Sequence, residues 1–95
     1  MIDHLVFLAV REDASPEEVD DLISSIRRLK ETVPGVVDLT VGENFSERSG
    51  GYTHGLFVRF ESVDDLQEYM KHPDHLAVVE KLDALTDRIV VDYEF

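Results

Sequence analysis

Apolar and polar positions divide this chain into stretches with two different periods. Residues 4–10, 36–41, 52–60 and 88–95 are short stretches that divide into two alternating faces, as strands do, and both faces of the first stretch are apolar. Between these stretches, apolar residues recur every three or four positions, as in Val19, Leu22, Ile26 and Leu29, which indicates amphipathic helices. The pattern therefore predicts four strands and a helical segment after the first and third of them.

Helix starts are marked by residues that cap free backbone amides. Ser15-Pro16-Glu17-Glu18 combines a serine cap, a proline at the first helical position and a glutamate three residues after the serine. Ser62 is expected to cap the second helix. Pro73 cannot continue that helix because it lacks an N–H and clashes with the preceding turn, so we expect it to begin a third helical piece.

The element order β-α-β-β-α-β, with a broken second helix, predicts an α+β fold of the ferredoxin-like type with an antiparallel sheet. We place the first and third strands side by side in the middle of this sheet, as parallel neighbours, with the helices covering one face. Parallel neighbours begin at the same edge, so His4 and His54 are expected to lie together. The helix break at Tyr69 to His75 is then expected to lie over both histidines.

The two faces of the predicted sheet differ in their cover. On the helix side, the second helix is expected to bury Leu66, Tyr69 and Met70, and the third to bury Leu76, Val79, Leu82 and Leu85. On the uncovered side, the pattern places Leu5, Phe7, Ala9, Phe57 and Val90. An apolar patch of this kind is typical of an interface, so we expect a symmetric homodimer formed through the open sheet face.

Composition narrows the class of partner. The 95 residues are expected to form one domain over 1–95, and 21 acidic against 9 basic residues give a net charge of -12, which disfavours nucleic acids and anionic membranes. There is no cysteine, so thiolate metal sites and cysteine nucleophiles are excluded. No apolar run reaches membrane-spanning length and the start lacks the features of a signal peptide, so we expect a cytoplasmic protein.

The candidate chemistry lies in the predicted pocket. A neutral imidazole at His75 has the right proton affinity to act as a general base on a carbon acid, and the Tyr69 hydroxyl could hold a substrate carbonyl. His4 and His54 are candidate substrate-binding residues, on an apolar floor made of Val6, Leu8, Leu22, Ile26, Leu56 and Val58. Each polar residue also has a structural explanation, as a helix-start histidine, a core tyrosine or a paired buried histidine.

Other sites find less support. His72 and His75 have a spacing that suits a metal, but Pro73 interrupts the helix and no third ligand follows, so we expect no metal site and no cofactor. The polar, glycine-bounded stretch 42–51 is long enough to act as a flap. His72 is expected to face outward as a cap.

Several segments together resemble the stress-responsive dimeric α/β-barrel (Dabb) family, which includes plant stress proteins. They are His4-Leu5-Val6, Gly51-Tyr52-Thr53-His54, Phe60-Glu61-Ser62, Tyr69 with His72-Pro73-Asp74-His75, and Asp92-Tyr93. The resemblance implies a dimeric α/β barrel that binds a small apolar or carbonyl-containing molecule.

For a cyclase of this family, the resemblance implies a cofactor-free aldol condensation of a linear polyketide. The base then maps to His75 and the orienting tyrosine to Tyr69, with aromatic lining positions replaced by Leu22 and Ile26 here. Two alternatives stay open: a non-catalytic stress-responsive dimer that binds a hydrophobic metabolite, and a cofactor-free monooxygenase. In some members a magnesium-like ion is held by backbone carbonyls near the end of the first helix.

Overall fold

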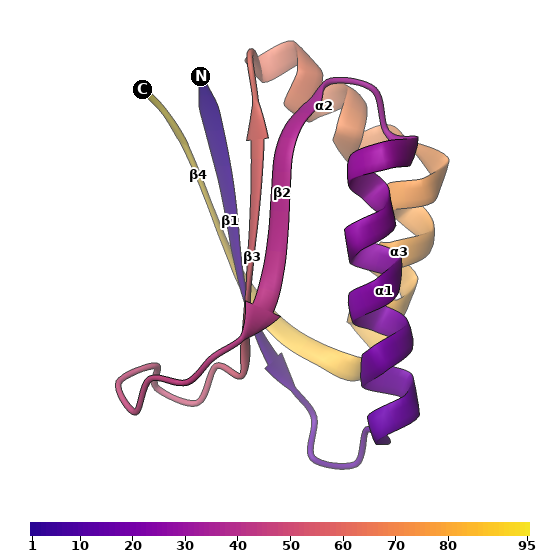
Figure 1. Cartoon of the computed structure of the whole chain (residues 1–95), viewed down its shortest axis with the longest axis vertical. Coiled ribbons are helices and arrows are strands. Elements are labelled where there is room, and N and C mark those ends of the chain that lie inside the picture. Colours follow the sequence, from indigo (N-terminus) through magenta and orange to yellow (C-terminus); the bar gives the residue numbers. More distant parts are fainter.

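A computed structural model describes all 95 residues of the chain as a sheet with helices on one side (Figure 1). The elements are β1 (Ile2–Val10), α1 (Pro16–Thr32), β2 (Val36–Glu43), β3 (His54–Phe60), α2 (Val63–Lys71), α3 (Pro73–Leu85) and β4 (Thr86–Glu94). The four strands form one antiparallel sheet in the order β2-β3-β1-β4. This confirms the predicted ferredoxin-like α+β fold, including the helix break at Pro73.

The predicted direction of the third strand was wrong, because β1 and β3 are antiparallel. The α1 crossover makes β1 parallel to β2 and leaves a gap between them, and β3 fills this gap after a hairpin with β2. β3 therefore runs opposite to both neighbours. In the resulting register His4 pairs with Val58, while His54 pairs with Leu8. The expected meeting of His4 and His54 at one edge does not occur.

All three helices begin at side-chain caps. The Ser15 hydroxyl accepts a hydrogen bond from the Glu18 amide at 3.1 Å, and the Glu18 carboxylate accepts one from the Ser15 amide at 2.9 Å. The Ser62 hydroxyl accepts from the Asp65 amide at 3.2 Å, and His72 Nδ1 accepts from the Asp74 amide at 3.1 Å. Both serine caps match the sequence prediction, and each fixes where a helix leaves the sheet.

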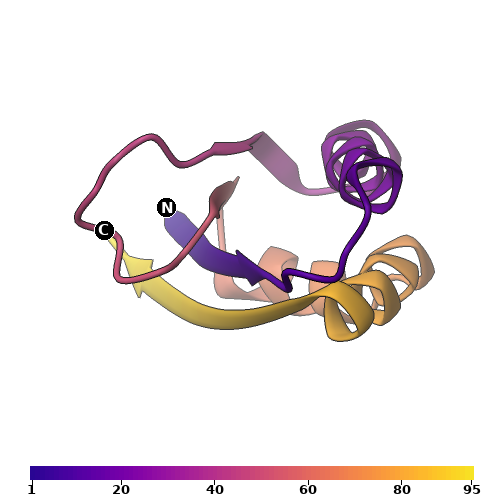
Figure 2. The same cartoon turned by 90° about the horizontal axis from the view of Figure 1, so that it is seen from below.

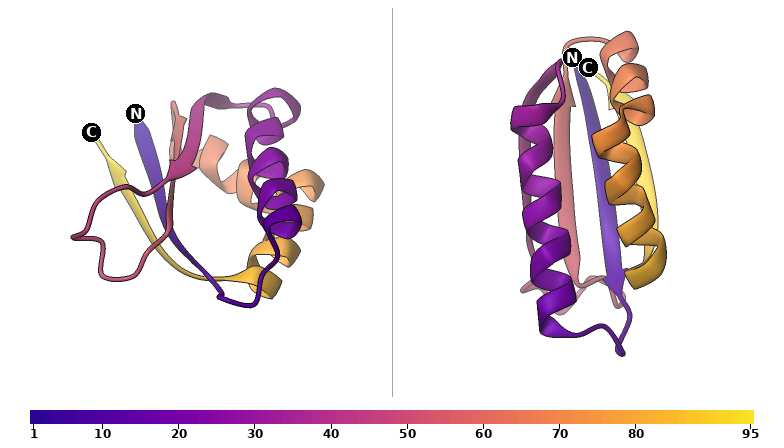
Figure 3. Two further views of the ribbon diagram at one scale, coloured as in Figure 1. Left: turned by 60° about the horizontal axis from the view of Figure 1, so that its bottom comes forward. Right: turned by 90° about the vertical axis from the view of Figure 1, so that its right-hand side faces the viewer.

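The core lies between the sheet and the helices (Figure 3). Leu8 and Val58 from the sheet and Leu22 and Ile26 from α1 are completely buried. The predicted buried faces of α2 and α3 need correction. Met70 and Leu76 are 45% and 51% exposed. Leu82 is buried as predicted, and α3 also buries the side chains of His75 and Val78. The apolar run Leu76-Ala77-Val78-Val79 offers no periodicity from which to choose the inner face.

No helix covers the other face of the sheet (Figure 2). As predicted, it carries Leu5, Phe7, Ala9 and Phe57, but the prediction of Val90 on this face was wrong. Val90 pairs with Val6 and faces the helices, whereas Ile89, Val91 and Tyr93 complete the open face. Alternation within β4 does not show which residues face the helices. The pairing with β1 does, because paired residues point to the same side of a sheet.

Candidate functional site

A cavity of about 120 Å³ lies between the helix-covered face of the sheet and the α2–α3 break. Ten of its 13 lining residues are hydrophobic when the amphipathic Tyr69 is included, and the remaining three are His4, His75 and Arg88. The apolar lining consists of Val6, Ile26, Leu29, Leu56, Met70, Val78, Val79, Leu82 and Val90. Met70 and Val90 are partly exposed, so they mark where the cavity meets solvent.

His75 is held in one orientation by the helix break. It occupies the first turn of α3, and its Nδ1 donates a hydrogen bond to the Met70 carbonyl oxygen at 3.3 Å. A carbonyl oxygen can only accept, so the neutral ring carries its proton on Nδ1 and has the Nε2 lone pair free. Burial lowers the pKa of His75 below its usual 6.5, although the Met70 hydrogen bond opposes this shift, so the ring is neutral at pH 7.

Tyr69 lies between the two buried histidines. Its ring centroid is 4.3 Å from that of His75 and 5.9 Å from that of His4, and its side chain is only 1% exposed. Burial alone raises the pKa of the phenol, with no hydrogen-bond contribution, so the hydroxyl keeps its proton. No side-chain polar atom is both fully buried and without a hydrogen-bond partner. Tyr69 lines the cavity, so its hydroxyl can donate a hydrogen bond to a molecule bound there.

His4 is oriented by the neighbouring strand. It pairs in register with Asp92 on β4, and its Nδ1 donates a short hydrogen bond to Asp92 Oδ1. The carboxylate accepts only, so it selects the His4 tautomer with the proton on Nδ1. Asp92 was missed as a candidate because alternation within β4 alone does not show that it stands opposite His4.

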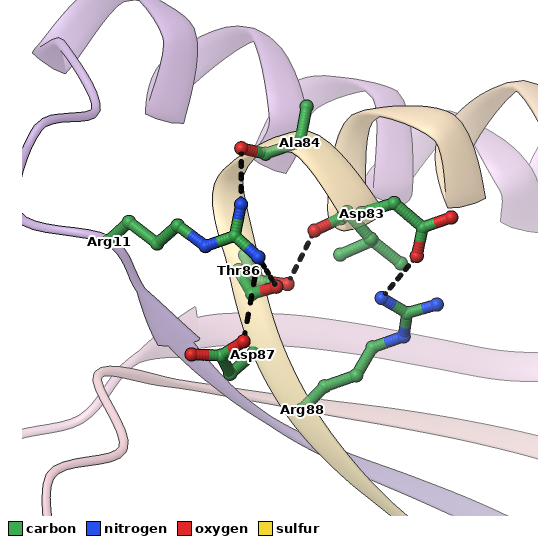
Figure 4. Close-up of polar contacts among 7 residues, drawn as sticks. Arg11, Asp83, Ala84, Thr86, Asp87 and Arg88 are labelled. Carbon is green, nitrogen blue, oxygen red and sulfur yellow. Dashed lines mark hydrogen bonds and ion pairs between the residues drawn. The ribbon is translucent and has the colours of Figure 1, made fainter.

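Arg88 is the one cation on the cavity wall. Its Nη1 lies 2.9 Å from Asp83 Oδ1, which ties the start of β4 to the end of α3 (Figure 4). At the same junction the Thr86 hydroxyl donates to the Leu82 carbonyl at 2.8 Å, and Arg11 Nη1 donates to the Ala84 carbonyl at 3.0 Å. These contacts hold a positive charge beside the histidines. Arg88 also carried no sequence signal, since its position depends on the pairing of β4 with β1.

The structure brings together part of the predicted site. His4, Tyr69 and His75 share the cavity with Val6, Ile26 and Leu56. The remaining predicted lining residues, Leu8, Leu22 and Val58, are completely buried in the core and do not line it.

His54 lies elsewhere. It stands at the start of β3, where its ring Nδ1 is 2.9 Å from the Thr53 hydroxyl oxygen, and it lines a different cavity with Phe7 and Tyr52. The loop that was interpreted as a flap also belongs to that region. It spans residues 44–53 and extends away from the helices, on the open side of the sheet (Figures 1 and 2). It therefore cannot cover the cavity at His75.

No group of three or more histidine or acidic side chains is arranged to hold a metal ion. None of the helices combines the length and the apolar character that crossing a membrane requires. The cavity instead offers a free imidazole nitrogen, a protonated phenol and an oriented second histidine in apolar surroundings. Such a set can remove a proton from carbon while donating hydrogen bonds to an adjacent carbonyl oxygen.

Fold and cavity together define an α+β ferredoxin-like protein with a histidine- and tyrosine-lined pocket. The model of the Stress responsive A/B Barrel Domain (Dabb) family matches residues 2–95, and the chain belongs to this family. The family resemblance inferred from the sequence is thereby confirmed.

This chain matches two curated relatives over most of the length of each. Olivetolic acid cyclase from Cannabis sativa is 24% identical over 95 residues, covering 97% of this chain and 94% of the cyclase. The stress-response A/B barrel domain-containing protein HS1 from Arabidopsis thaliana is 27% identical over 96 residues, covering 98% of this chain and 88% of HS1.

Solved structures share the fold closely. A dimeric ferredoxin-like protein from Bacteroides fragilis superimposes with a TM-score of 0.83 at 27% identity, covering 99% of this chain and 95% of the other. A hydroxynitrile lyase from Passiflora edulis reaches a TM-score of 0.89 at 23% identity, covering 97% and 90% of the two chains. Structural relatives of this fold thus include dimers and at least one enzyme.

Proposed function

We propose that this chain forms a homodimer in which each subunit uses the cavity at His75 for cofactor-independent acid–base chemistry on a small carbonyl compound. His75 Nε2 removes a proton from the carbon next to the carbonyl. The Tyr69 hydroxyl donates a hydrogen bond to the carbonyl oxygen as negative charge develops there. The observation that carries the proposal is the Met70 carbonyl bound to His75 Nδ1, because it leaves Nε2 as the free base.

The cavity volume limits the substrate. About 120 Å³ corresponds to roughly four water molecules at their liquid volume, which is below the size of pockets for drug-like ligands. A short aldehyde or ketone fits this space. A long polyketide chain requires the exposed Met70 and Val90 side chains at the mouth to move aside.

The test is hydrogen–deuterium exchange at the α-carbon of short ketones and aldehydes in D₂O, followed by NMR. We expect the catalysed rate to fall about 100-fold or more in His75→Ala, which lacks the base, and less in Tyr69→Phe. His54→Ala is the matched control, since it removes a histidine that lies outside the cavity, and it should leave the rate unchanged. A rate retained in His75→Ala contradicts the proposal, as does the absence of exchange above buffer.

A second candidate is a non-catalytic dimer that binds an apolar metabolite. It is favoured by the predominance of hydrophobic residues among those that line the cavity. Chemical-shift changes confined to cavity residues on titration with short ketones, without any α-carbon exchange, would support this candidate. Oxygen consumption with a hydroquinone would instead indicate the monooxygenase alternative.

A further inference from the structure

The open face of the sheet contains a trough at one end. Gly42, Gly55 and Phe7 are paired across β2, β3 and β1, so two adjacent positions on this face have no side chain. A Cβ built on Gly42 or Gly55 would meet no atom within 4 Å. The hollow has a volume of about 540 Å³, and Tyr52, whose ring centroid is 6.2 Å from that of Phe7, forms part of its wall. Nothing in the subunit requires these glycines for packing.

The loop 44–53 forms the other wall of this trough. It leaves the sheet on the side away from the helices, so it extends past the open face into the space where a second molecule would pack (Figures 1 and 3). Phe45 on this loop is 100% exposed. Burying a fully exposed phenyl ring against another surface would gain the free energy of transferring its apolar area out of water. The loop itself is ordered by the Asn44 side-chain amide, which donates to the carbonyl oxygens of Ser46 and Tyr52.

Charge also favours a second copy as the occupant. Two chains of net charge -12 repel each other, so their contact surfaces need few free carboxylates. On the open face Asp3 is bound by Arg59 through two hydrogen bonds of 2.7 and 3.0 Å, and Asp87 lies 3.5 Å from Arg11. Apolar surface extends to the edge strand β4, where Val91 and Tyr93 are both 46% exposed. This surface is therefore more complementary to the same face of a second copy than to a charged partner.

We propose that the loop 44–53 is an arm that crosses to a second copy of this chain, with Phe45 as its anchor, and that the trough at Gly42 and Gly55 is a socket filled by the second copy. The inference rests on the proposed homodimer and adds the contacts that hold it together. The arm extends the contact beyond the sheet face, and the socket gives the interface a fixed position that a flat apolar sheet lacks.

Gly55→Val tests the socket by filling it. Neither Gly42 nor Gly55 has a positive φ angle and both have free space beside them, so valine is tolerated and suits a strand better than glycine. We expect an unchanged or higher free energy of unfolding for the subunit. The dimer dissociation constant, measured by sedimentation equilibrium, should nevertheless rise about 10- to 100-fold, because the space for the second copy is lost.

Phe45→Ala tests the arm, with Leu76→Ala as the control on the helix side, where the leucine is 51% exposed. We expect Phe45→Ala to weaken the dimer about 10- to 100-fold and Leu76→Ala to leave it unchanged. A photoreactive benzophenone amino acid at position 45 should give a cross-linked product of twice the subunit mass, and the same group at position 76 should not.

The outcomes separate the two proposals. A wild-type protein that sediments as a monomer at micromolar concentration overturns the homodimer of the proposed function and the arm with it. A wild-type dimer whose dissociation constant is unchanged by both Gly55→Val and Phe45→Ala, with only cross-links inside one subunit, overturns the arm and socket alone.

Discussion

The proposed chemistry depends on a few side chains that are oriented by hydrogen bonds to a backbone carbonyl and a carboxylate. The Met70 carbonyl sets the tautomer of His75, and the Asp92 carboxylate sets that of His4. The residue types were visible in the sequence. Their orientations were not, because they depend on the sharp turn before Pro73 and on the register between β1 and β4. Sequence reasoning therefore found the base candidate but missed Asp92.

At the residue scale, His75 makes stability depend on pH. Its folded pKa is lower than the 6.5 of an exposed histidine, so the unfolded chain binds this proton first as pH falls. The resulting stability is fully present above pH 6.5 and is lost as pH falls towards the folded pKa. We expect the free energy of unfolding, measured in urea, to decrease from pH 7.5 to 5.5, and the decrease to be smaller in His75→Gln.

Between pH 5.5 and 7.5, the two carboxylates whose pKa values are lowered in the folded state stay ionised. Asp3 and Asp38 have pKa values below the usual 3.8, because Arg59 and Lys30 respectively donate hydrogen bonds to them, so their contributions are lost only in stronger acid. An equal decrease in the wild type and in His75→Gln would show that His75 is not buried in its neutral form.

At the scale of elements, the order of strands and helices could be predicted because each helix start has its own local signal. Ser15 and Ser62 act as caps, and Pro73 starts α3 as expected. The direction of the third strand was predicted wrongly because the reversal at the β2–β3 hairpin was not taken into account: β2 runs parallel to β1, so β3 runs opposite to both. His54 therefore lies at the opposite end of the sheet from His4, and it does not line the cavity at His75.

At the break between α2 and α3, the His72 ring accepts a hydrogen bond from the Asp74 amide and so caps α3. We expect His72→Ala to lower the free energy of unfolding by about 1 kcal/mol, since an N-cap is lost, and His72→Asn to retain most of the stability. Urea denaturation measures both. Equal stabilities for the alanine and asparagine variants would show that the cap contributes nothing.

At the scale of the whole molecule, the open face of the sheet exposes apolar side chains to solvent in a single subunit. Alternation in the first and third strands was sufficient to predict it. For β4 the prediction chose the wrong phase, because Ile89, Val90 and Val91 are all apolar and only pairing with β1 assigns them. The position of the loop 44–53 also depends on tertiary structure. The stretch 42–51 was interpreted as long enough to act as a flap, but the loop lies on the side of the sheet opposite the cavity at His75.

A charge on the open face should prevent dimer formation. Val91 and Val63 are both 46% exposed, but Val91 lies on the open face and Val63 on α2. Val91→Asp should therefore sediment as a monomer at concentrations where Val63→Asp remains a dimer, because only the first variant buries a carboxylate at the interface. Equal sedimentation of the two variants as dimers would show that this face is not the interface.

The proposed function requires His75 to be a neutral base with its proton on Nδ1 and its Nε2 lone pair free in the cavity. Long-range ¹H–¹⁵N NMR of the imidazole rings at pH 7.5, with the His75 signals assigned by their loss in His75→Gln, reads the tautomer directly. The structure predicts a protonated Nδ1 and an unprotonated Nε2. A proton on Nε2, or a doubly protonated ring at this pH, would contradict the account.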